Sequence, residues 1–499
     1  MIGPNSSEHS ETHRDEWARR QINVVYLSAI TLVTIAAAAL RAVRLDHPVR
    51  YDEAFSYLAY ATGQGPSVWL AYTFPNNHLF HTLLVHFSTA LGGPGLAAIR
   101  APAFIAGVGL VPLAAALAHR LSGRKMDALF AALFVGASSI LVEYSVNARG
   151  YSMVCASTMV MCLATLEINR RPKAWIAWFV WVMAAVAGLF TIPVMVYPIG
   201  LLSIIIASDA VKRRESGKEE LSFLAAALAI TSFMVGLLYL PSIRISGLDA
   251  IVSNRFVQPI PISEVVHQLP GTVVVTGLHW TRDLGGFVLL IVAGLGASAF
   301  LGIRQRDPFL LLPLIAPPLL LAAATTQRVV PFPRVWVFLL PIFLVCAAVG
   351  LGYIYVVAIA RKYRVAAGCL IVSVFALAMT QGTRVLTRDY LISEDSRTLV
   401  DAEAIVHDLA PFNEPTVSLV HEIPSGPSLA YYTILQGRES WIRPDEPNIT
   451  RGFVVVAYGQ TLEEVIAAYP NLGARINTIR RRLRYPRAEV WEVMLREEK

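Results

Sequence analysis

Residues 335–360 read VWVFLLPIFLVCAAVGLGYIYVVAIA, a run without a charged side chain. A helix rises about 1.5 Å per residue, so this run is long enough to cross the roughly 30 Å hydrocarbon core of a bilayer. A second run of this kind, VVYLSAITLVTIAAAAL, covers residues 24–40. Strands of a membrane β-barrel alternate polar and apolar residues over about ten positions, and these runs do not alternate. The sequence therefore predicts a polytopic α-helical membrane protein.

The composition of the whole chain fits this class. Of 499 residues, 55% are hydrophobic and 15% charged, with a mean hydropathy of +0.54, whereas soluble domains carry about 25% charged residues. The net charge of +7 arises in basic loops between apolar runs, so it does not indicate nucleic-acid binding. Four cysteines lie inside apolar runs, which predicts neither disulfides nor a cysteine metal site: Cys155, Cys162, Cys346 and Cys369.

Eleven crossings are expected. They are placed at 23–43, 96–118, 126–146, 151–168, 174–189, 191–208, 221–240, 284–303, 309–324, 335–359 and 365–380. The polar N-terminal tail does not resemble a cleavable signal, and we expect it in the cytoplasm. Loops such as HRLSGRK and KRRESGKEE then lie inside, where basic residues are denser, as the positive-inside rule requires. The odd number of crossings places the C-terminus outside.

One apolar stretch is not counted as a crossing. HLFHTLLVHFSTALGG (78–93) is short, carries three histidines and ends in glycines. If it crossed, every later loop would invert and the basic loops would face outward. We therefore expect an interfacial or re-entrant helix within a first outer loop of about 44–95.

The composition changes at about residue 384. Charged residues become frequent, and apolar runs shorten to strand length in TVSLVHE, GFVVVAYG and AEVWEVML, with helix-like stretches such as TLEEVIAAYP between them. The predicted organisation is a transmembrane domain over 1–383 and a small extracytoplasmic α/β domain over 384–499.

Several outer segments carry side chains that suit an anionic substrate and proton transfer. The segments are RYDEAFS, FPNNHLFH, EYSVNARGYS and TTQRVVPFPR. The candidate residues are Asp52, Glu53, His78, His81, Glu143, Arg149, Tyr151, Arg328 and Arg334.

Each candidate also has a purely structural interpretation. Asp52 would cap the helix that begins at EAFSYLAY, with Glu53 favoured by the helix dipole. His78 and His81 would be interfacial residues. Arg149 would anchor a short loop to lipid headgroups, and Glu143 would pair with it.

The order of these motifs adds information. Over roughly residues 24–350 the chain resembles bacterial GT-C glycosyltransferases that use polyprenyl-phosphate sugars, a group that includes protein O-mannosyltransferases and the lipid A aminoarabinose transferase. The matching elements are YDEAF, the short helix with its glycine turn, RAPAFIAGVGL, YSVNARGYS and PRVWVFLLP. Two departures stand out. This chain has Pro75-Asn76-Asn77-His78 where relatives often have His-Pro-Pro, and Asn147 where they often have an acid.

The resemblance implies an inverting, GT-C-like membrane enzyme with about 11 transmembrane helices in the bacterial inner membrane. It implies that Asp52 acts as general base on an acceptor hydroxyl and that Glu53 orients it or binds substrate. Arg149 and Arg334, with Arg328 as a further candidate, would hold the lipid phosphate. The acceptor would be an envelope glycan, lipid or protein. No cofactor is indicated, and participation of a divalent metal is left open.

Two other classes of protein remain as alternatives. A lipid-linked sugar transporter or flippase would show charges within the crossings and broken helices. Prolines at 193, 198, 313, 317 and 318 allow such breaks. A non-catalytic scaffold, with the work done by its C-terminal domain, would stay active without both outer carboxylates.

Overall fold

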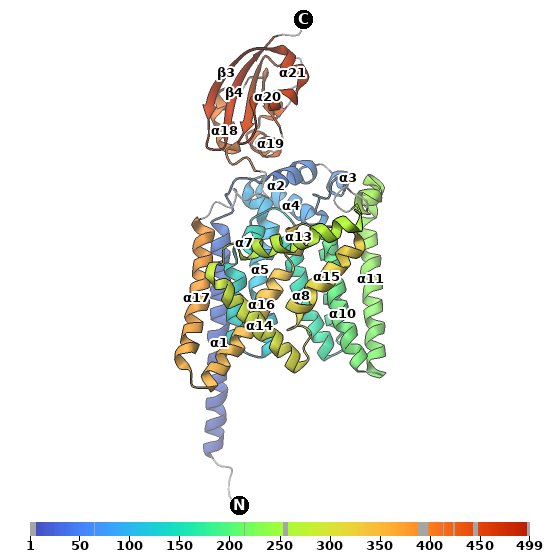
Figure 1. Cartoon of the computed structure of the whole chain (residues 1–499), viewed down its shortest axis with the longest axis vertical. Helices are drawn as coiled ribbons and strands as arrows, with labels where there is room; N and C mark the ends of the chain where they lie inside the picture. The colour runs from blue at the N-terminus through green and yellow to red at the C-terminus, as the bar shows by residue number, and fades with distance from the viewer. Residues whose placement is uncertain are drawn as a thin grey trace, which may run out of the picture.

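The computed structural model describes residues 6–496 except residues 64, 214, 253–257, 388–397, 413, 423–424 and 443–447. A bundle of helices carries a small α/β domain at one end, and the N-terminus lies beyond the other end (Figure 1). We call the end that carries the α/β domain the outer end. The two termini therefore lie at opposite ends of the molecule, as an odd number of crossings requires.

Long apolar helices build the bundle. They are α1 (Ser6–Ala42), α5 (Leu96–Ser122), α8 (Tyr151–Arg170), α10 (Val196–Lys212), α11 (Glu215–Ser246), α14 (Val288–Gln305), α16 (Leu339–Ala360) and α17 (Arg364–Thr387). Shorter ones are α6 (Lys125–Ala137), α7 (Ser139–Ser145), α9 (Trp175–Thr191) and α15 (Leu312–Gln327). Within the described residues, eight helices are long and apolar enough to span a membrane, or nine if α6 and α7 form one bent span. The prediction of a multi-pass membrane protein is confirmed. Each predicted crossing falls on a helix, although α9 and α15 are shorter than a full span.

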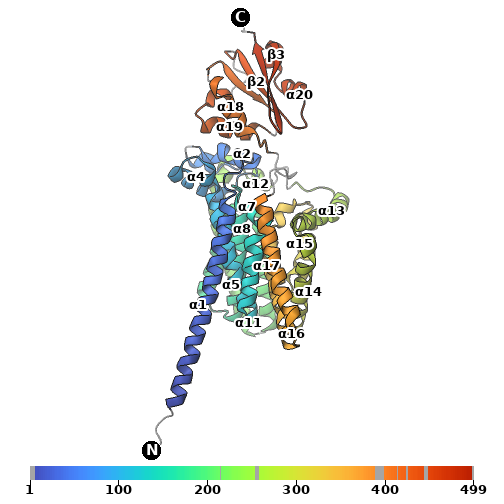
Figure 2. The same ribbon diagram turned by 90° about the vertical axis from the view of Figure 1, so that its left-hand side faces the viewer.

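The outer end is covered by short elements. They are α2 (Tyr51–Ser56), the π-helix η1 (Tyr57–Ala61), α3 (Pro66–Trp69), α4 (Leu79–Gly92), η2 (Pro193–Met195), α12 (Asp249–Val252), η3 (Gly285–Phe287) and η4 (Pro333–Trp336). Helix α4 corresponds to the stretch 78–93 and lies beside α2 at the outer end of the bundle (Figure 2). This position agrees with the expectation of an interfacial helix in the first outer loop.

Helix α13 (Ile262–Thr281) is absent from the sequence prediction, which left this segment as an outer loop. Its stretch PGTVVVTG combines proline, glycine and β-branched residues, which have low helix propensity. In Figure 1 the helix runs across the outer ends of the membrane helices. It contacts α15 and η4, the element that contains Arg334.

The break between α6 and α7 is stabilised from the neighbouring helix α1. The two helices meet at Ser138 with a bend of 59°, which leaves carbonyl groups of α6 without helical partners. The buried guanidinium of Arg41 donates to the carbonyl of Gly136 (2.9 Å) and to the Ser145 hydroxyl (3.1 Å). The break redirects α7 so that the segment after it, residues 146–150, enters the outer end.

The C-terminal domain is a four-stranded sheet with helices on both faces. The strands are β1 (Val417–His421), β2 (Arg451–Ala457), β3 (Ile476–Arg484) and β4 (Ala488–Leu495), in the order β1-β2-β4-β3. Only β1 and β2 pair in parallel. The helical elements are α18 (Ala402–Asp408), η6 (Ala410–Phe412), α19 (Gly426–Leu435), η7 (Glu439–Ile442), α20 (Leu462–Ala467) and α21 (Pro470–Arg475). The predicted fold class, a polytopic helical protein with a small α/β domain, is confirmed.

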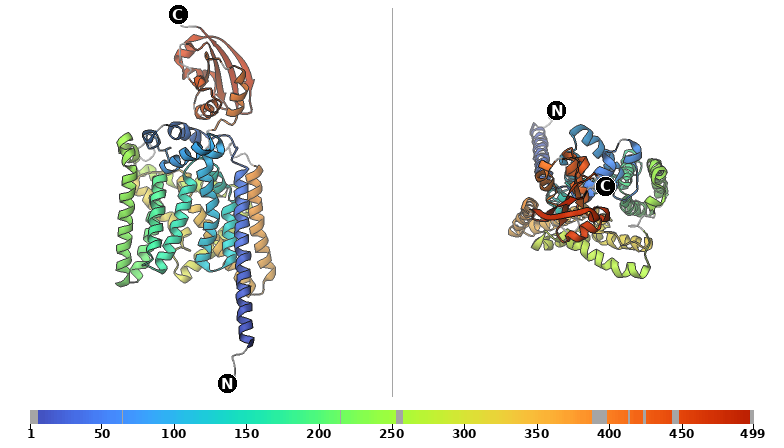
Figure 3. Two further views of the ribbon diagram at one scale, coloured as in Figure 1. Left: turned by 180° about the vertical axis from the view of Figure 1, so that it is seen from behind. Right: turned by 90° about the horizontal axis from the view of Figure 1, so that it is seen from above.

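Strand β3 was not predicted, because the run of arginines in INTIRRRLR conceals its few apolar positions. Figure 3 shows the domain from behind and from above, where it lies over the outer end of the bundle. Helix α17 continues to Thr387, past the predicted domain boundary at 383/384.

Candidate active site

The two acidic residues of RYDEAFS have different surroundings. Glu53 is fully buried. Its carboxylate accepts two hydrogen bonds from the guanidinium of Arg100, at 2.8 and 2.9 Å, and one each from the backbone N–H groups of Ala148 (2.5 Å) and Arg50 (2.9 Å). Burial raises the pKa of Glu53, but Arg100, Arg50 and the Ala148 N–H outweigh it, so the pKa lies below its usual value. Glu53 therefore stays ionised and is closed to a substrate.

Arg100, which comes from the motif RAP at the start of α5, is also satisfied by the chain. Beside Glu53 it donates to the carbonyl groups of Leu45 (2.6 Å), His47 (2.7 Å) and Pro48 (3.3 Å). Two motifs that lie far apart in the sequence thus form one buried unit, which fixes α2 against α5. In this position Glu53 orients α2 and does not contact the solvent.

Asp52 is the open member of the pair. Its side chain is 35% exposed, and one carboxylate oxygen accepts a hydrogen bond from the side-chain amide of Asn76 (3.1 Å). The other oxygen lies 3.8 Å from Nη2 of Arg149. The structural interpretation of Asp52 as helix cap is wrong, because Arg50 occupies the N-cap of α2. Asp52 is held in place and reachable from solvent, as a general base must be.

Arg149 lies inside the protein and does not face lipid, so the headgroup-anchor interpretation is also wrong. Its side chain is 4% exposed. Nη1 donates to the Ser56 hydroxyl (3.2 Å) and to the Asn76 carbonyl (3.4 Å). Its Nε is buried and has no hydrogen-bond partner within the described structure. A buried donor without a partner is costly, so this atom marks a place for an acceptor group.

His78 directs a second donor toward the same place. Its Nδ1 accepts a hydrogen bond from the backbone N–H of Gly150 (2.8 Å), so the neutral ring carries its proton on Nε2. Nε2 lies 3.3 Å from Nη2 of Arg149, which is also a donor. Burial, followed by Arg149, lowers the pKa of His78 well below its usual value, so the ring is neutral. Two donors that lie this close together are stabilised by an anion that accepts a hydrogen bond from both.

Gly150 makes this contact geometrically feasible. A Cβ at this position would lie 2.3 Å from Cγ2 of Thr191 and 3.3 Å from Nδ1 of His78. The contact with Thr191 is the prohibitive one, so only glycine lets the backbone pass this side chain while its N–H reaches the imidazole. The glycine of the motif ARGY therefore serves to position His78.

The remaining candidates complete the arrangement. His81 is buried, its Nε2 has no partner within the described residues, and burial together with Arg149 lowers its pKa to about 3. The Tyr151 ring meets the His78 ring edge-on at 5.3 Å. Arg334 is close enough to His78 to contribute to lowering its pKa, and its guanidinium lies over the Phe332 ring (4.7 Å).

Two predicted residues lie elsewhere. Glu143 does not pair with Arg149; it forms ion pairs with Arg50 (3.1 Å) and Arg282, and so links α7 to the start of α2 and to the end of α13. Arg328 ends α15 in a left-handed conformation (φ 56°), and its exposed side chain forms no ion pair with the other candidates within the described part of the chain.

Sequence reasoning missed several residues that shape the site. Asn76 and Ser56 fix Asp52 and Arg149. Tyr60 and Tyr72 lie close to Arg149. Burial raises the pKa values of their hydroxyl groups, and the charge of Arg149 lowers them by a smaller amount. The sequence did contain one signal for Asn76, because Pro75-Asn76-Asn77-His78 departs from the His-Pro-Pro that relatives often have. Tyr60 lies in the π-helix η1, a type of irregularity that often accompanies functional sites.

No cluster of three or more His, Cys, Asp or Glu side chains suited to a metal ion occurs among the described residues. All four cysteines are free, three of them buried and Cys369 exposed. Asp52 lies beside Arg149 and Asn76, so the residues of this site provide a cationic, hydrogen-bonding environment.

The fold that carries this site is similar to that of a known protein. The crystal structure of ArnT from Cupriavidus metallidurans in the apo state matches with a TM-score of 0.59 and 14% identity over 95% of this chain and 98% of that chain. The chain has the fold of a GT-C glycosyltransferase. The same protein bound to undecaprenyl phosphate matches with a TM-score of 0.57, 14% identity and the same coverage.

A sequence-based finding supports the fold match. The model of the family described as dolichyl-phosphate-mannose-protein mannosyltransferase matches residues 77–239. This range contains His78, His81, Glu143, Arg149 and Tyr151. No curated protein sequence matches the chain significantly. The prediction of a GT-C glycosyltransferase is confirmed by the fold and the family match together.

Proposed function

We propose that this protein transfers a sugar from a polyprenyl-phosphate carrier to an acceptor hydroxyl at the outer face of the cytoplasmic membrane, with inversion at the anomeric carbon. The observation that carries the proposal is the pairing of an accessible carboxylate, Asp52, with a buried arginine, Arg149, that retains an unpaired donor. A base and an anion-binding group stand next to each other at one site.

The chemistry follows from these positions. The acceptor oxygen attacks the anomeric carbon while its proton passes to a carboxylate oxygen of Asp52. The bond between the anomeric carbon and the phosphate oxygen breaks, and its electron pair leaves with the polyprenyl phosphate. That leaving group is already an anion, so it requires cations and hydrogen-bond donors and no acid. Arg149 and the Nε2–H of His78 supply donors, and Arg334 adds positive charge.

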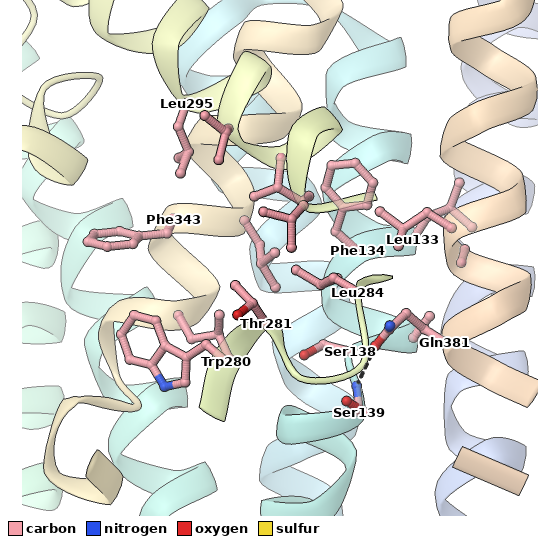
Figure 4. A pocket seen from close by; sticks show the side chains of 18 residues that line it. Leu133, Phe134, Ser138, Ser139, Trp280, Thr281, Leu284, Leu295, Phe343 and Gln381 are labelled. Atoms are coloured by element: carbon pink, nitrogen blue, oxygen red, sulfur yellow. Dashed lines mark hydrogen bonds between the residues drawn. The ribbon is translucent and has the colours of Figure 1, made fainter. Parts of the chain in front are cut away.

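The carrier's lipid tail also has a suitable site. An apolar groove with an accessible volume of about 140 Å³ opens between α6, α13, α14, α16 and α17, and its walls include Leu133, Phe134, Leu284, Leu295 and Phe343 (Figure 4). Helix α7 connects this groove to the site: Ser139 at its start lines the groove, where its N–H donates to Gln381 (3.3 Å). Seven helical residues span about 10 Å, a distance that a prenyl chain covers easily. The undecaprenyl phosphate bound to ArnT supports this class of donor.

The fold and the family match favour transfer over transport. To test the proposal, purified protein is incubated with lipid-linked sugars extracted from a strain that lacks it, where the unused donor accumulates, and with envelopes of that strain. We expect polyprenyl phosphate to be released and the sugar to appear on the acceptor with the opposite anomeric configuration, as measured by NMR. Movement of intact donor across proteoliposome membranes without release of polyprenyl phosphate would favour a flippase instead.

The orientation of the bundle is tested separately. In a variant without native cysteines, Tyr458→Cys places a thiol on the C-terminal domain and Lys173→Cys one on the opposite end, and both positions are exposed. An impermeant thiol reagent is expected to label the first in intact spheroplasts and the second only after lysis. The reverse pattern would place the proposed site in the cytoplasm.

A further inference from the structure

A groove separates the first outer loop from the C-terminal domain. Its accessible volume is about 450 Å³, which lies within the range of ligand sites, roughly 300–1,000 Å³. One wall is formed by α2 and η1 and includes Phe55 and Ala59. The other is formed by the C-terminal domain and includes His421, Glu422, Ala430 and Tyr469.

The two walls are joined through α19. The hydroxyl of Tyr432 accepts a hydrogen bond from the backbone N–H of Val49 (3.2 Å), and the Ser428 hydroxyl donates to the Val49 carbonyl (3.3 Å). Tyr431 donates to the carbonyl of Pro94 (2.7 Å). Val49 directly precedes α2, so these buried bonds fix the C-terminal domain beside the helix that carries Asp52. These contacts therefore hold the two walls of the groove in place.

The groove lies against the helix that carries the proposed base. Asp52 and Phe55 are three residues apart on α2, and residues at this spacing share one face of a helix. The Phe55 ring lines the groove, while the carboxylate of Asp52 remains open to solvent. The Tyr51 and Phe74 rings lie beside Phe55 at 6.4 and 5.7 Å. A molecule lying in the groove therefore contacts an aromatic ring on the helix face that also carries Asp52.

The charge of the groove differs from that of the phosphate site. No lysine or arginine lines it within the described residues. Gly426 lets the backbone approach the His421 ring, because a Cβ there would lie 2.7 Å from Cε1. Burial lowers the pKa of His421, although Glu422 opposes this, and the ring is neutral at pH 7. An anionic acceptor would find no cation here, whereas hydroxyl groups find a carboxylate and an imidazole.

We propose that this groove binds the acceptor and that the acceptor is an uncharged saccharide, an inference that rests on the proposed glycosyl transfer. The C–H faces of the sugar rings pack on Phe55 and Tyr469, and hydroxyl groups bond to Glu422 and His421. The hydroxyl at the saccharide's end reaches Asp52. The C-terminal domain is then the part of the enzyme that recognises the acceptor.

The test uses full-length protein, lipid-linked sugar from a strain lacking it, and the glycan fraction of that strain's envelopes after protease treatment and solvent extraction. Ala430→Trp fills the groove, and Glu422→Gln replaces a charged hydroxyl acceptor by a neutral, weaker one without adding bulk. Leu435→Trp, on the same helix but outside the groove and 41% exposed, is the matched control. We expect Ala430→Trp to raise KM for the glycan about tenfold or more with KM for the donor within about twofold, a smaller rise for Glu422→Gln, and wild-type values for the control.

Each result decides one question. Equal KM values for the glycan in all variants would overturn the groove as acceptor site. If the transferred sugar appears only with untreated envelopes, in protein or in extractable lipid, the acceptor is not a saccharide, and that part of the proposal is wrong. If wild-type protein releases no polyprenyl phosphate with any fraction, the proposed function itself fails, and the inference fails with it.

Discussion

Two carboxylate–arginine pairs have their acids at neighbouring positions of α2 and differ in almost every physical respect. Glu53 and Arg100 are buried, joined by two hydrogen bonds, and every oxygen of Glu53 has a partner. Asp52 and Arg149 are 3.8 Å apart, one side chain is partly exposed, and the other has an unpaired Nε. The closed pair stabilises the outer loop, and the open pair keeps hydrogen-bonding capacity for a substrate. The following substitutions test this contrast.

The largest effect is expected for Asp52→Asn. The amide keeps the size of the side chain but removes the base, so the transfer rate should fall by about two to four orders of magnitude. The thermal unfolding midpoint should hardly change, because Asp52 is partly exposed and its ion pair is long. Transfer rates in purified, monodisperse protein provide the measurement. Near-wild-type turnover would remove Asp52 from the reaction.

Glu53→Gln should have the opposite profile. The substitution leaves the buried guanidinium of Arg100 without its carboxylate, and breaking such a pair costs roughly 3–5 kcal/mol of stability. We expect a low yield of folded protein and a lower unfolding midpoint. Glu463→Gln, at an exposed position of α20, is the control and should behave as wild type. A stable Glu53→Gln protein without activity would show that Glu53 takes part in the chemistry.

Arg149 distinguishes charge from geometry. Lysine keeps the charge but loses the planar set of donors, so Arg149→Lys should fold and use the donor poorly, and Arg149→Ala should be weaker still. Losing one such donor costs roughly 3 kcal/mol, or about two orders of magnitude in rate. The measurement is the transfer rate against donor concentration, with Arg328→Lys as control. Full activity in both Arg149 variants would move the phosphate role to Arg334.

The smallest effect concerns pH. The pKa of His81 falls to about 3 in the folded protein, and that of His78 also falls, so both rings are neutral when folded and become protonated on unfolding below the usual value of about 6.5. Since the unfolded state then binds more protons, stability decreases as the pH falls from about 6.5, by up to roughly 1.4 kcal/mol per pH unit for each histidine.

The unfolding midpoint between pH 7 and 5 measures this slope. His81→Asn should flatten it, whereas His407→Asn, at a side chain that is 80% exposed, should not. An identical slope in wild type and His81→Asn would show that His81 is not held neutral in the folded protein.

The sequence by itself determined the membrane fold, because apolar runs of spanning length report burial in lipid directly. The short helix at 78–93 and three of the four strands followed from the same local patterns. Helix α13 and strand β3 did not, since their local propensities oppose the structures that packing imposes. The motif order also pointed to the outer segments that meet in the site.

Only the tertiary structure decided which acid is buried and which is open to solvent. Asp52 and Glu53 are neighbours of similar chemistry, and their roles separate because successive residues on a helix point about 100° apart. Arg100, nearly fifty positions away, takes one of them into the core, and Asn76 and Arg149 hold the other at the surface. Such partners are long-range, so no local pattern reveals them. The same holds for the groove, which exists because α19 docks beside α2 from the far end of the chain.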